Sequence, residues 1–492
     1  MPSYPNFLGG SYTSQSPLAD CARTVNWYPE RVDGPGAMNV LALYPTPGQQ
    51  AFTTTADLGG RGAFTMASRT HFVMGAGVYE VFGTASATKR GTVVQDNNPA
   101  SMTYNGSAGN QLCIASGGTL YYLNLTTNGL SATTGVTKGL QVGMIDGYFV
   151  SFDNTTNRIY VSPLNDTTGT WDATNFAQRS TQPDPWQAMI ITPPDVWLIG
   201  EQTGDVWYDA GTSPFPLAPR SGVTFRFGIV APFSLAAIGN TVLWLARDKD
   251  GAGVVVQTRG YSPQPVSSKA LETAISGYAR TSSITDAEAF TYKQEGHDFY
   301  VLRFPSANAT WVYDPSLPPS VAWHERGTWD SAANRFDVWR PRVHTYAFGQ
   351  HLVGDATTGA INTMDVTYGS EADGMAIRRL RIPPPLYVAS RETRLFVSRF
   401  EPIFEPGLGT NSGQGLSPQA MLRISRDTKT WSSERMRSVG AMGQYSQRTY
   451  WLQNGSSTLV WVPELSVSDP IPWRLLGADL DGRGFRQPQA AA

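Results

Sequence analysis

The chain has 492 residues, only 15% of them charged, and a formal net charge of −2. At this length it can hold two or three domains, and its charged fraction is well below the roughly one quarter that is typical. Affinity for the DNA backbone rises with the number of cationic side chains that displace counterions from the phosphates. A near-neutral chain is therefore not expected to bind DNA tightly. Much of the surface is expected to be uncharged, which suits protein interfaces.

Cys21 and Cys113 are the two cysteines, too few for a disulfide framework in a chain of this size. This usage predicts assembly in a reducing cytoplasm. The first residues lack a basic region followed by an apolar stretch, and no run of about 18 apolar residues occurs anywhere. The sequence therefore predicts neither export by a standard signal nor insertion into a membrane.

Residues 1–60 are predicted to form an extended, irregular N-terminal arm. Pro29, Pro45 and Pro47 remove backbone donors and bias this segment toward extended or turn geometry. Such an arm is ordered only when it lies along another surface. Two surfaces are available, the propeller of its own chain described next or a neighbouring subunit.

Residues 61–376 repeat one sequence pattern, which consists of an aromatic or β-branched strand, a tight polar turn and a second such strand. Clear copies have their turns at residues 75–77, 153–157 and 202–204. Successive copies lie roughly 40 to 55 residues apart, the spacing of four-stranded propeller blades. The pattern predicts a six- or seven-bladed β-propeller, with a run of sandwich domains as the alternative.

One segment of this region has a helical pattern. Ser268 is placed to cap a helix over residues 268–279, in which Leu271, Ile275 and Tyr278 share one side. We expect this helix as an insertion between two blades.

The C-terminal part is predicted to be a separate domain. A basic, proline-broken stretch at residues 377–385 indicates an interdomain boundary. Strands in residues 386–484 alternate as half-buried strands do, which predicts a small β-sandwich-like domain. Residues 485–492 are predicted to be a flexible tail. The predicted fold class is therefore all-β.

Residues 425–431 have the outline of an Asp-box, the hairpin turn of sialidases and other propellers, with Lys429 where that pattern has glycine. In such a turn the aspartate accepts backbone N–H bonds and the tryptophan packs beneath. We expect a structural and not a catalytic role for Ser425, Asp427, Thr430 and Trp431.

Three segments carry a resemblance to a known family. Residues 26–30 read Asn-Trp-Tyr-Pro-Glu, residues 44–48 read Tyr-Pro-Thr-Pro-Gly, and residues 434–451 continue from the Asp-box outline. Together they resemble the packaged-DNA-stabilisation proteins of short-tailed bacteriophages, also described as tail accessory factors or nozzle proteins. That family has the same order of arm, propeller and C-terminal β-domain, and a counterpart of the mid-chain helix.

The resemblance implies a structural virion protein, a nozzle or hub of the phage tail, assembled in the host cytoplasm. It would form a ring, a hexamer, beneath the portal and close or extend the channel that retains packaged DNA until ejection. The implied partners are further copies of itself, the tail adaptor or head-tail connector, and tail needle, spike or fibre proteins. Double-stranded DNA would make transient contact in the channel, and no membrane insertion is implied.

Motifs for catalysis are absent from the sequence. Its five histidines form no His-x-His or His-Glu-x-x-His arrangement, and no Gly-x-Ser-x-Gly elbow, P-loop or dinucleotide fingerprint occurs. Asp355, Asp365 and Glu371 offer carboxylates for a glycosidase pair, but a chain of this length offers many such pairs. We expect no catalytic, cofactor-binding or metal-binding residues.

An arginine-rich stretch is the candidate interface or channel cluster. It comprises Arg378, Arg379, Arg381, Arg391, Arg394 and Arg399. These side chains suit contact with DNA in a lumen or with acidic patches on a neighbour, and a solvated or interfacial face is the expectation that we favour.

The alternative function is a glycan-binding or sialidase-like propeller that recognises host surface carbohydrate. Sugars stack on flat aromatic rings, and candidate rings are Trp197, Trp207, Trp244, Trp311 and Trp339. These tryptophans lie at alternating strand positions, so we expect them to fill the interfaces between blades instead.

Overall fold

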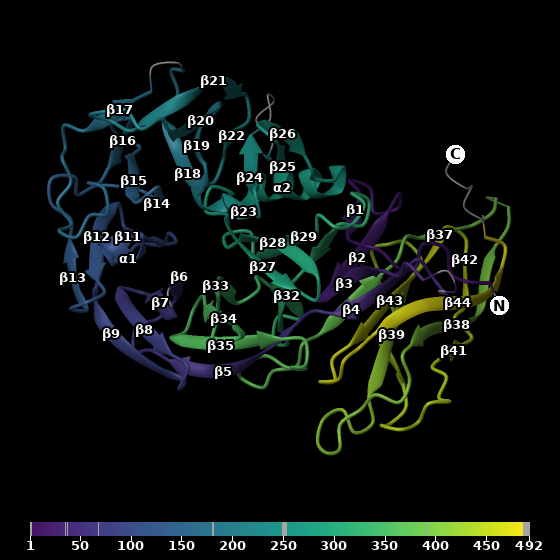
Figure 1. The fold of residues 1–492 in the computed structure, drawn as a ribbon. Coiled ribbons are helices and arrows are strands. Elements are labelled where there is room, and N and C mark those ends of the chain that lie inside the picture. The colour runs from purple at the N-terminus through teal and green to yellow at the C-terminus, as the bar shows by residue number, and fades with distance from the viewer. Residues whose placement is uncertain are drawn as a thin grey trace.

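The computed structural model describes residues 2–34, 36, 38–66, 68–179, 182–247, 253–390 and 392–485. The chain forms a β-propeller, seen along its axis in Figure 1, with a β-sandwich at one side. The predicted all-β architecture is confirmed, and within the described residues the propeller has seven blades.

Blades 1 to 4 are four-stranded sheets whose strands follow one another along the chain. They are β6 (Gly60–Met66), β7 (Arg69–Met74), β8 (Gly77–Phe82) and β9 (Ser86–Thr92); β10 (Ser101–Tyr104), β11 (Gln111–Ser116), β12 (Thr119–Asn124) and β13 (Gly129–Ala132); β14 (Val142–Ile145), β15 (Tyr148–Asp153), β16 (Arg158–Val161) and β17 (Phe176–Gln178); and β18 (Trp186–Thr192), β19 (Asp195–Gly200), β20 (Gly204–Asp209) and β21 (Leu217–Phe225). A short helix, α1 (Gly106–Gly109), joins β10 to β11.

Blades 5 to 7 carry the additions to this plan. Their strands are β22 (Gly228–Ile229), β23 (Ala236–Ile238), β24 (Thr241–Arg247), β25 (Gly253–Arg259) and β26 (Ser262–Pro265); β27 (Glu288–Gln294), β28 (His297–Phe304), β29 (Ala309–Tyr313) and β30 (Trp323–Glu325); and β33 (Pro341–Ala347), β34 (Gln350–Asp355), β35 (Ala360–Asp365) and β5 (Gly48–Thr54). A 3-10 turn, η1 (Pro232–Ser234), precedes β23, and a hairpin of β31 (Thr328–Asp330) and β32 (Arg335–Asp337) follows blade 6.

The predicted helix is α2 (Lys269–Thr281), between blades 5 and 6. The Ser268 side chain caps it by accepting a hydrogen bond from the Leu271 backbone N–H at 3.2 Å. Leu271 and Ile275 are buried on the face that packs into the core between the two blades, as the sequence pattern predicts.

Strand β5 closes the propeller. It pairs antiparallel with β35, with Thr54 opposite Ala360 and Gly48 opposite Asp365, so the N-terminal segment supplies the outer strand of the last blade. The inner strands β33 and β6 then meet across the seam. The propeller therefore begins at β5, which corrects the expected start at residue 61.

Each pair of neighbouring blades encloses its own hydrophobic cluster, because successive side chains of a strand point to opposite faces. On β19, Val196 and Leu198 pack toward blade 3, while Trp197 and Ile199 pack toward blade 5. Central blade strands are therefore apolar on both faces.

The sandwich is made of two sheets. One is ordered β3 (Trp27–Arg31), β4 (Leu41–Pro45), β44 (Leu475–Arg483), β38 (Leu395–Phe404) and β41 (Trp451–Leu452), with β42 (Ser456–Ser457) also on β38. The other continues the sheet of blade 6 from β30 through β2 (Cys21–Val25), β36 (Arg379–Ile382), β43 (Val460–Val467) and β39 (Gln419–Ser425) to β40 (Arg435–Ser438). Two short strands flank it, β1 (Tyr12–Thr13) on β2 and β37 (Leu386–Tyr387) on β43.

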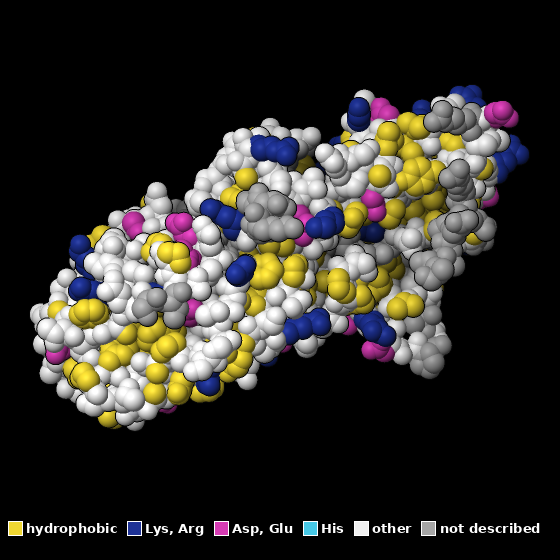
Figure 2. All heavy atoms as spheres, turned by 90° about the horizontal axis from the view of Figure 1, so that it is seen from above, with side chains coloured by type: hydrophobic (Ala, Val, Ile, Leu, Met, Phe, Trp, Pro, Cys, Tyr) yellow, Lys and Arg dark blue, Asp and Glu magenta, His cyan; other side chains and the backbone are white. Residues whose placement is uncertain are grey.

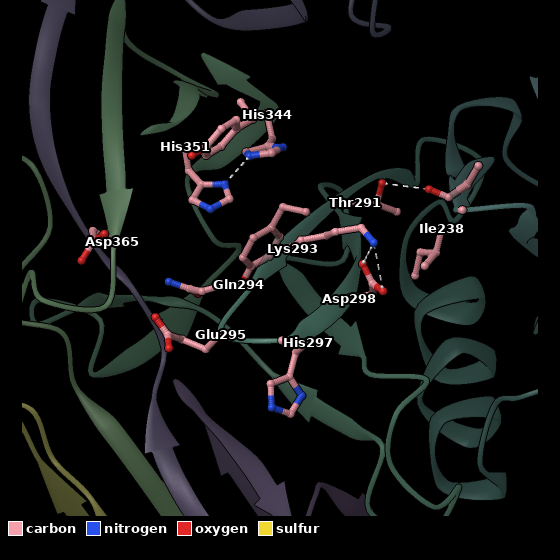
Figure 3. Close-up of a pocket in the computed structure, with 15 residues that line it drawn as sticks. Ile238, Thr291, Lys293, Gln294, Glu295, His297, Asp298, His344, His351 and Asp365 are labelled. Atoms are coloured by element: carbon pink, nitrogen blue, oxygen red, sulfur yellow. Dashed lines mark hydrogen bonds and ion pairs between the residues drawn. The ribbon is translucent and has the colours of Figure 1, made fainter. Parts of the chain in front are cut away.

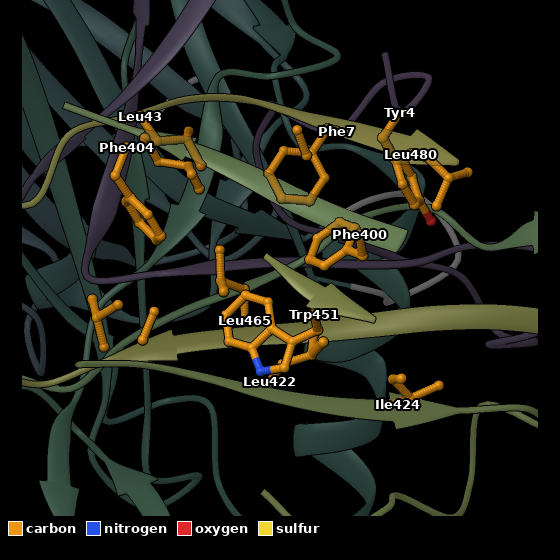
Figure 4. Close-up of a cluster of buried hydrophobic side chains, with 14 of the residues drawn as sticks. Tyr4, Phe7, Leu43, Phe400, Phe404, Leu422, Ile424, Trp451, Leu465 and Leu480 are labelled. Carbon is orange, nitrogen blue, oxygen red and sulfur yellow. The ribbon is translucent and has the colours of Figure 1, made fainter. Parts of the chain in front are cut away.

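Between these sheets lies one large hydrophobic core, shown in Figure 4. Four of its aromatic or aliphatic side chains, Tyr4, Phe7, Trp27 and Leu43, come from the N-terminal segment. Trp27 is fully buried and donates its indole N–H to the Trp473 carbonyl at 3.0 Å.

Two expectations about the domain plan are therefore wrong. The N-terminal segment is not irregular, because β1 to β5 pair with strands of both the propeller and the sandwich of the same chain. The stretch at residues 377–385 is not a boundary, because β36 lies inside a continuous sheet between β2 and β43. Of the predicted tail, Phe485 pairs with Val388, and residues 486–492 lie outside the described residues.

A buried histidine ties the sandwich to the propeller. His297 on β28 contacts Asp314 through Nδ1 and Glu30 of β3 through Nε2, both at 2.6 Å. The hydrogen bond to Asp314 is the largest cause; with the charge of that carboxylate and a smaller contribution from Glu30, it outweighs burial and raises the pKa of His297 to about 9. The imidazolium thus links blade 6 to a strand of the sandwich at neutral pH.

Candidate functional site

The Asp-box outline forms the turn that follows β39. Asp427 Oδ1 accepts the backbone N–H groups of Lys429 at 2.8 Å and Thr430 at 2.7 Å, and Oδ2 accepts the Thr430 hydroxyl at 2.7 Å. Ser425 Oγ contacts Asp427 Oδ1 at 3.1 Å, and Trp431 packs on a small buried cluster. These hydrogen bonds hold the pKa of Asp427 well below its usual range. Ser425, Asp427 and Thr430 thus hydrogen-bond within the turn, and Trp431 packs at its end.

The turn differs from the Asp-box in one respect. The left-handed backbone conformation falls on Thr428, with φ +63°, and not on Lys429 where the pattern has glycine. The segment is also one residue shorter than the pattern, which explains why the glycine position does not transfer.

The predicted arginine cluster is divided by the fold. Arg379 and Arg381 are each 1% exposed. Arg381 donates to the backbone carbonyls of Phe7 at 2.6 Å and Gly10 at 3.1 Å, and to Thr24 Oγ1 at 2.7 Å. Burial lowers the pKa of both guanidinium groups to about 10, so both stay charged at neutral pH. These two arginines fix the N-terminal segment in place and are unavailable to DNA.

The other arginines of the stretch are partly exposed or lie outside the described residues. Arg378 stacks over the Trp329 ring at 4.4 Å, and Arg399 pairs with Glu401 at 2.7 Å. Arg394 is exposed, and Arg391 is outside the described residues. The predicted grouping as one cluster is therefore wrong, because both faces of β36 are covered and bury Arg379 and Arg381.

The tryptophans of the glycan hypothesis are buried. Trp197, Trp207, Trp244, Trp311 and Trp339 are 0% to 7% exposed and lie in the clusters between blades. None of these rings offers a face to a sugar, as expected from their alternating strand positions.

Side chains of the inner strands leave only a small cavity at the centre of the propeller. A cavity of about 350 Å³ touches the inner parts of six blades, with Phe64, Met102, Met144, Ile191 and Phe233 in its wall. At ~30 Å³ per molecule, this space holds about a dozen waters. A DNA duplex is roughly 20 Å across, the scale set by its grooves. DNA therefore cannot pass along the axis of a single propeller.

Metal and membrane features are not found in the part of the chain that the structure describes. No group of three or more His, Cys, Asp or Glu side chains there is arranged to hold a metal ion. No helix among the described residues is long and apolar enough to cross a membrane. Both cysteines are buried and free.

Charged side chains are scattered over the face shown in Figure 2, where uncharged and hydrophobic atoms dominate. On the sandwich, large apolar side chains are exposed, among them Phe396 at 43%, Met436 at 56%, Tyr445 at 75% and Leu452 at 53%. Several of them lie on β40, β41 and the segment between these strands. A concentration of this kind is typical of protein interfaces.

Similar solved structures include the N-terminal domain of Nup159 (11% identity, 65% of this chain, 94% of that chain, TM-score 0.36), a streptogramin B lyase (10%, 65%, 98%, 0.41) and the extracellular domain of the putative one component system BT4673 from B. thetaiotaomicron (10%, 82%, 58%, 0.41). These likenesses are too weak to carry an argument. Among curated proteins no match is found.

Two family models match the chain. One is described as bacteriophage P22 Gp10, beta-propeller, and covers residues 25–369; the other is described as bacteriophage P22 Gp10, beta-sandwich, and covers residues 387–477. The first match begins inside the N-terminal segment, in agreement with the β5 strand that closes the propeller. The chain therefore belongs to the bacteriophage P22 Gp10 family of phage structural proteins that stabilise packaged DNA.

Proposed function

We propose that this chain is a nozzle or hub subunit of a phage tail that forms a closed ring, a hexamer, beneath the portal and its adaptor. The ring closes or extends the channel and retains packaged DNA until ejection. It carries out no chemical step. Its partners are further copies of the chain, the adaptor, and needle, spike or fibre proteins, and it contacts DNA only transiently.

The observation that carries this proposal is the small size of the cavity at the centre of the propeller. The cavity that touches six of the blades holds only about a dozen waters at ~30 Å³ each, far less than a duplex roughly 20 Å across occupies, so we expect that one copy does not surround DNA. A protein of this family that acts on packaged DNA by enclosing it must then do so with several copies around a shared axis. The low net charge supports sliding, since few phosphate contacts would hold the DNA.

The sandwich supplies a candidate contact surface for such a ring. Strands β40 and β41 end their sheets, so each has one unpaired edge. The two edges lie at the same side, because the Trp451 indole N–H donates to the Arg435 carbonyl at 3.0 Å. Met436 and Leu452 are exposed on these strands. A head-to-tail ring needs two different complementary patches on each subunit, and this surface suits one of them.

The test is quantitative peptide mass spectrometry of DNA-filled particles, counting this chain relative to the portal protein. About six copies per particle are expected for a ring closed by cyclic symmetry. Native mass spectrometry of the purified protein, alone and with the adaptor, then shows whether the ring forms unaided. Absence of the chain from filled particles would overturn the proposal.

A further inference from the structure

One side of the sandwich is exposed over a long stretch of chain. It comprises residues 426–452, from the turn after β39 through β40 to β41, and we call it the sandwich edge. Its exposed side chains include Met436, Met442, Tyr445 and Leu452, and Tyr445 is 75% exposed. Methionine, aromatic residues and arginine are the types enriched at the cores of protein interfaces.

The sandwich edge is basic. It contains five lysines and arginines and two aspartates and glutamates. Both acids are engaged within the chain, since Asp427 accepts hydrogen bonds in its own turn and Glu434 pairs with Arg378 at 2.5 Å. Arg437 is exposed, and among the described residues it donates only to the Met436 carbonyl, at 3.1 Å. A complementary partner is therefore both apolar and acidic.

Blades 3 and 4 carry most of the negative charge of the propeller. Residues 142–225 contain nine aspartates and glutamates but three lysines and arginines, whereas residues 48–141 contain three acids and five cations. Two of the three cations are already paired, Arg179 with Asp205 at 2.7 Å and Arg220 with Asp195 at 2.5 Å. Figure 1 shows blade 3 at the opposite side of the propeller from the sandwich, with blade 4 next to it.

Several acids of these two blades are available at the surface. Asp146, Asp172 and Glu201 are exposed, and within the part of the chain that the structure describes none of them pairs with a lysine or arginine. Leu164, which is 55% exposed, lies beside the turn that holds Asp146, because the next residue donates its N–H to the Gly147 carbonyl at 3.0 Å. This end of the molecule thus offers acidic groups and an exposed apolar side chain.

The acids of blades 5 to 7 are better compensated. Figure 3 shows a cavity of about 800 Å³ between these blades, with Glu295 and Asp365 in its wall. In the same wall Lys293 pairs with Asp298 at 3.0 Å, and His297, whose pKa is raised to about 9 by Asp314, adds a positive charge. Blades 3 and 4 are therefore the better match for the basic sandwich edge.

We propose that the sandwich edge of one copy docks onto blades 3 and 4 of the next copy, head to tail. The inference rests on the proposed ring and names the two surfaces that close it. Opposite charge at opposite ends of one chain favours this arrangement, because two sandwich edges placed together would repel each other. DNA fits the sandwich edge less well, since Met436, Tyr445 and Leu452 have no counterpart on a phosphate backbone.

Photo-crosslinking in filled particles tests the contact directly. The photoreactive residue p-benzoylphenylalanine replaces Tyr445, and the particles are assembled with this variant as the only source of the chain. Irradiation should join two copies, with position 445 linked to residues 142–225. The same residue in place of Tyr346, an exposed tyrosine of blade 7, is the control and should give no such product.

The outcome separates this inference from the ring itself. About six copies per particle with position 445 linked to the adaptor, to DNA or to another part of the chain would overturn the docking and leave the ring standing. The same holds if no crosslink forms. Absence of the chain from filled particles would overturn the ring, and the docking with it.

Charge reversal tests the basic side of the contact. Arg437→Glu with Lys429→Glu should lower the number of copies per filled particle, counted by peptide mass spectrometry, at least about tenfold, because attraction becomes repulsion. The matched control is Arg259→Glu with Arg280→Glu, two exposed arginines of β25 and α2, which changes the net charge equally and should assemble as the parent chain does. Circular dichroism confirms that both variants fold.

Charge exchange then tests whether the two surfaces meet. Asp172→Arg with Glu201→Arg alone should assemble as poorly as the sandwich-edge variant. All four substitutions in one chain should recover most of the parent copy number, because the charges attract again with their signs exchanged. Unchanged assembly of the sandwich-edge variant, or no recovery in the fourfold variant, would overturn the docking.

Discussion

The propeller and the sandwich are built by different routes through the chain. Six blades consist largely of strands that follow one another, and the core is divided into clusters between neighbouring blades. The sandwich has one core that draws Tyr4, Phe7, Trp27 and Leu43 from the opposite end of the chain. The propeller is therefore expected to tolerate local change, while the sandwich depends on the N-terminal segment.

Deleting residues 2–46 should have the largest effect, because it removes β1 to β4, which the sandwich needs, and leaves β5, which the propeller needs. Four buried side chains of the sandwich core are lost, each worth about 1.5–3 kcal/mol. Their sum, about 6–12 kcal/mol, is close to the whole stability of a domain. Hydrogen exchange should show β39 and β43 unprotected while β19 and β24 stay protected. Protected sandwich strands would show that the N-terminal segment is dispensable.

Arg381→Met tests the same dependence at a single residue. The change leaves the Phe7 and Gly10 carbonyls and the Thr24 hydroxyl without their donor inside the protein. Buried groups that lose a partner cost about 1–3 kcal/mol, so unfolding of the sandwich should shift by about 2–3 kcal/mol in denaturant titration.

Arg394→Met is the control for Arg381→Met, since Arg394 is exposed in the same stretch and should change stability by less than about 0.5 kcal/mol. Equal effects of the two substitutions would mean that burial of Arg381 contributes nothing.

His297 allows a test of the junction between the propeller and the sandwich. Its pKa is raised to about 9 by Asp314 and Glu30, so its contribution is fully present below the unfolded value near 6.5. The contribution is lost as pH rises through about 9. The stability difference between the parent chain and His297→Gln should therefore shrink between pH 7 and pH 10 in thermal unfolding. A difference that stays constant with pH would rule out the imidazolium link.

Features that depend on neighbouring residues could be predicted from the sequence. The hairpins, α2 with its Ser268 cap and the Asp427 turn each involve partners a few residues apart, so periodicity and turn chemistry reveal them. The pairing of β5 with β35 joins residues about 300 positions apart, and no local pattern encodes it.

The burial of Arg379 and Arg381 was not predicted for a related reason. In β36, Arg379-Leu380-Arg381-Ile382 alternates as a half-exposed strand does, yet the structure covers both faces. Arginine is rarely buried, and the backbone carbonyls that satisfy Arg381 lie in a segment more than 350 residues away. The alternation itself was a usable signal for a strand at this place instead of a boundary. The cavity of about 800 Å³ between blades 5, 6 and 7 likewise combines residues that lie far apart in the sequence.

Asp427→Ala should have the smallest effect on stability, because the turn is at the surface and Asp427 hydrogen-bonds only to residues of that turn. Asp427 accepts two backbone N–H groups and the hydroxyls of Ser425 and Thr430, whereas Asp172, an exposed turn aspartate of the propeller, accepts only the N–H and hydroxyl of Thr174. Hydrogen exchange at Lys429 and Thr430 should therefore accelerate more in Asp427→Ala than exchange at Thr174 does in Asp172→Ala. Both carboxyl groups have lowered pKa values, so in the parent chain both turns lose protection only as pH falls below the ordinary value near 3.9. If the two alanine variants behave alike, the two additional hydrogen bonds at Asp427 add no local stability, and the sandwich turn is equivalent to an ordinary propeller turn.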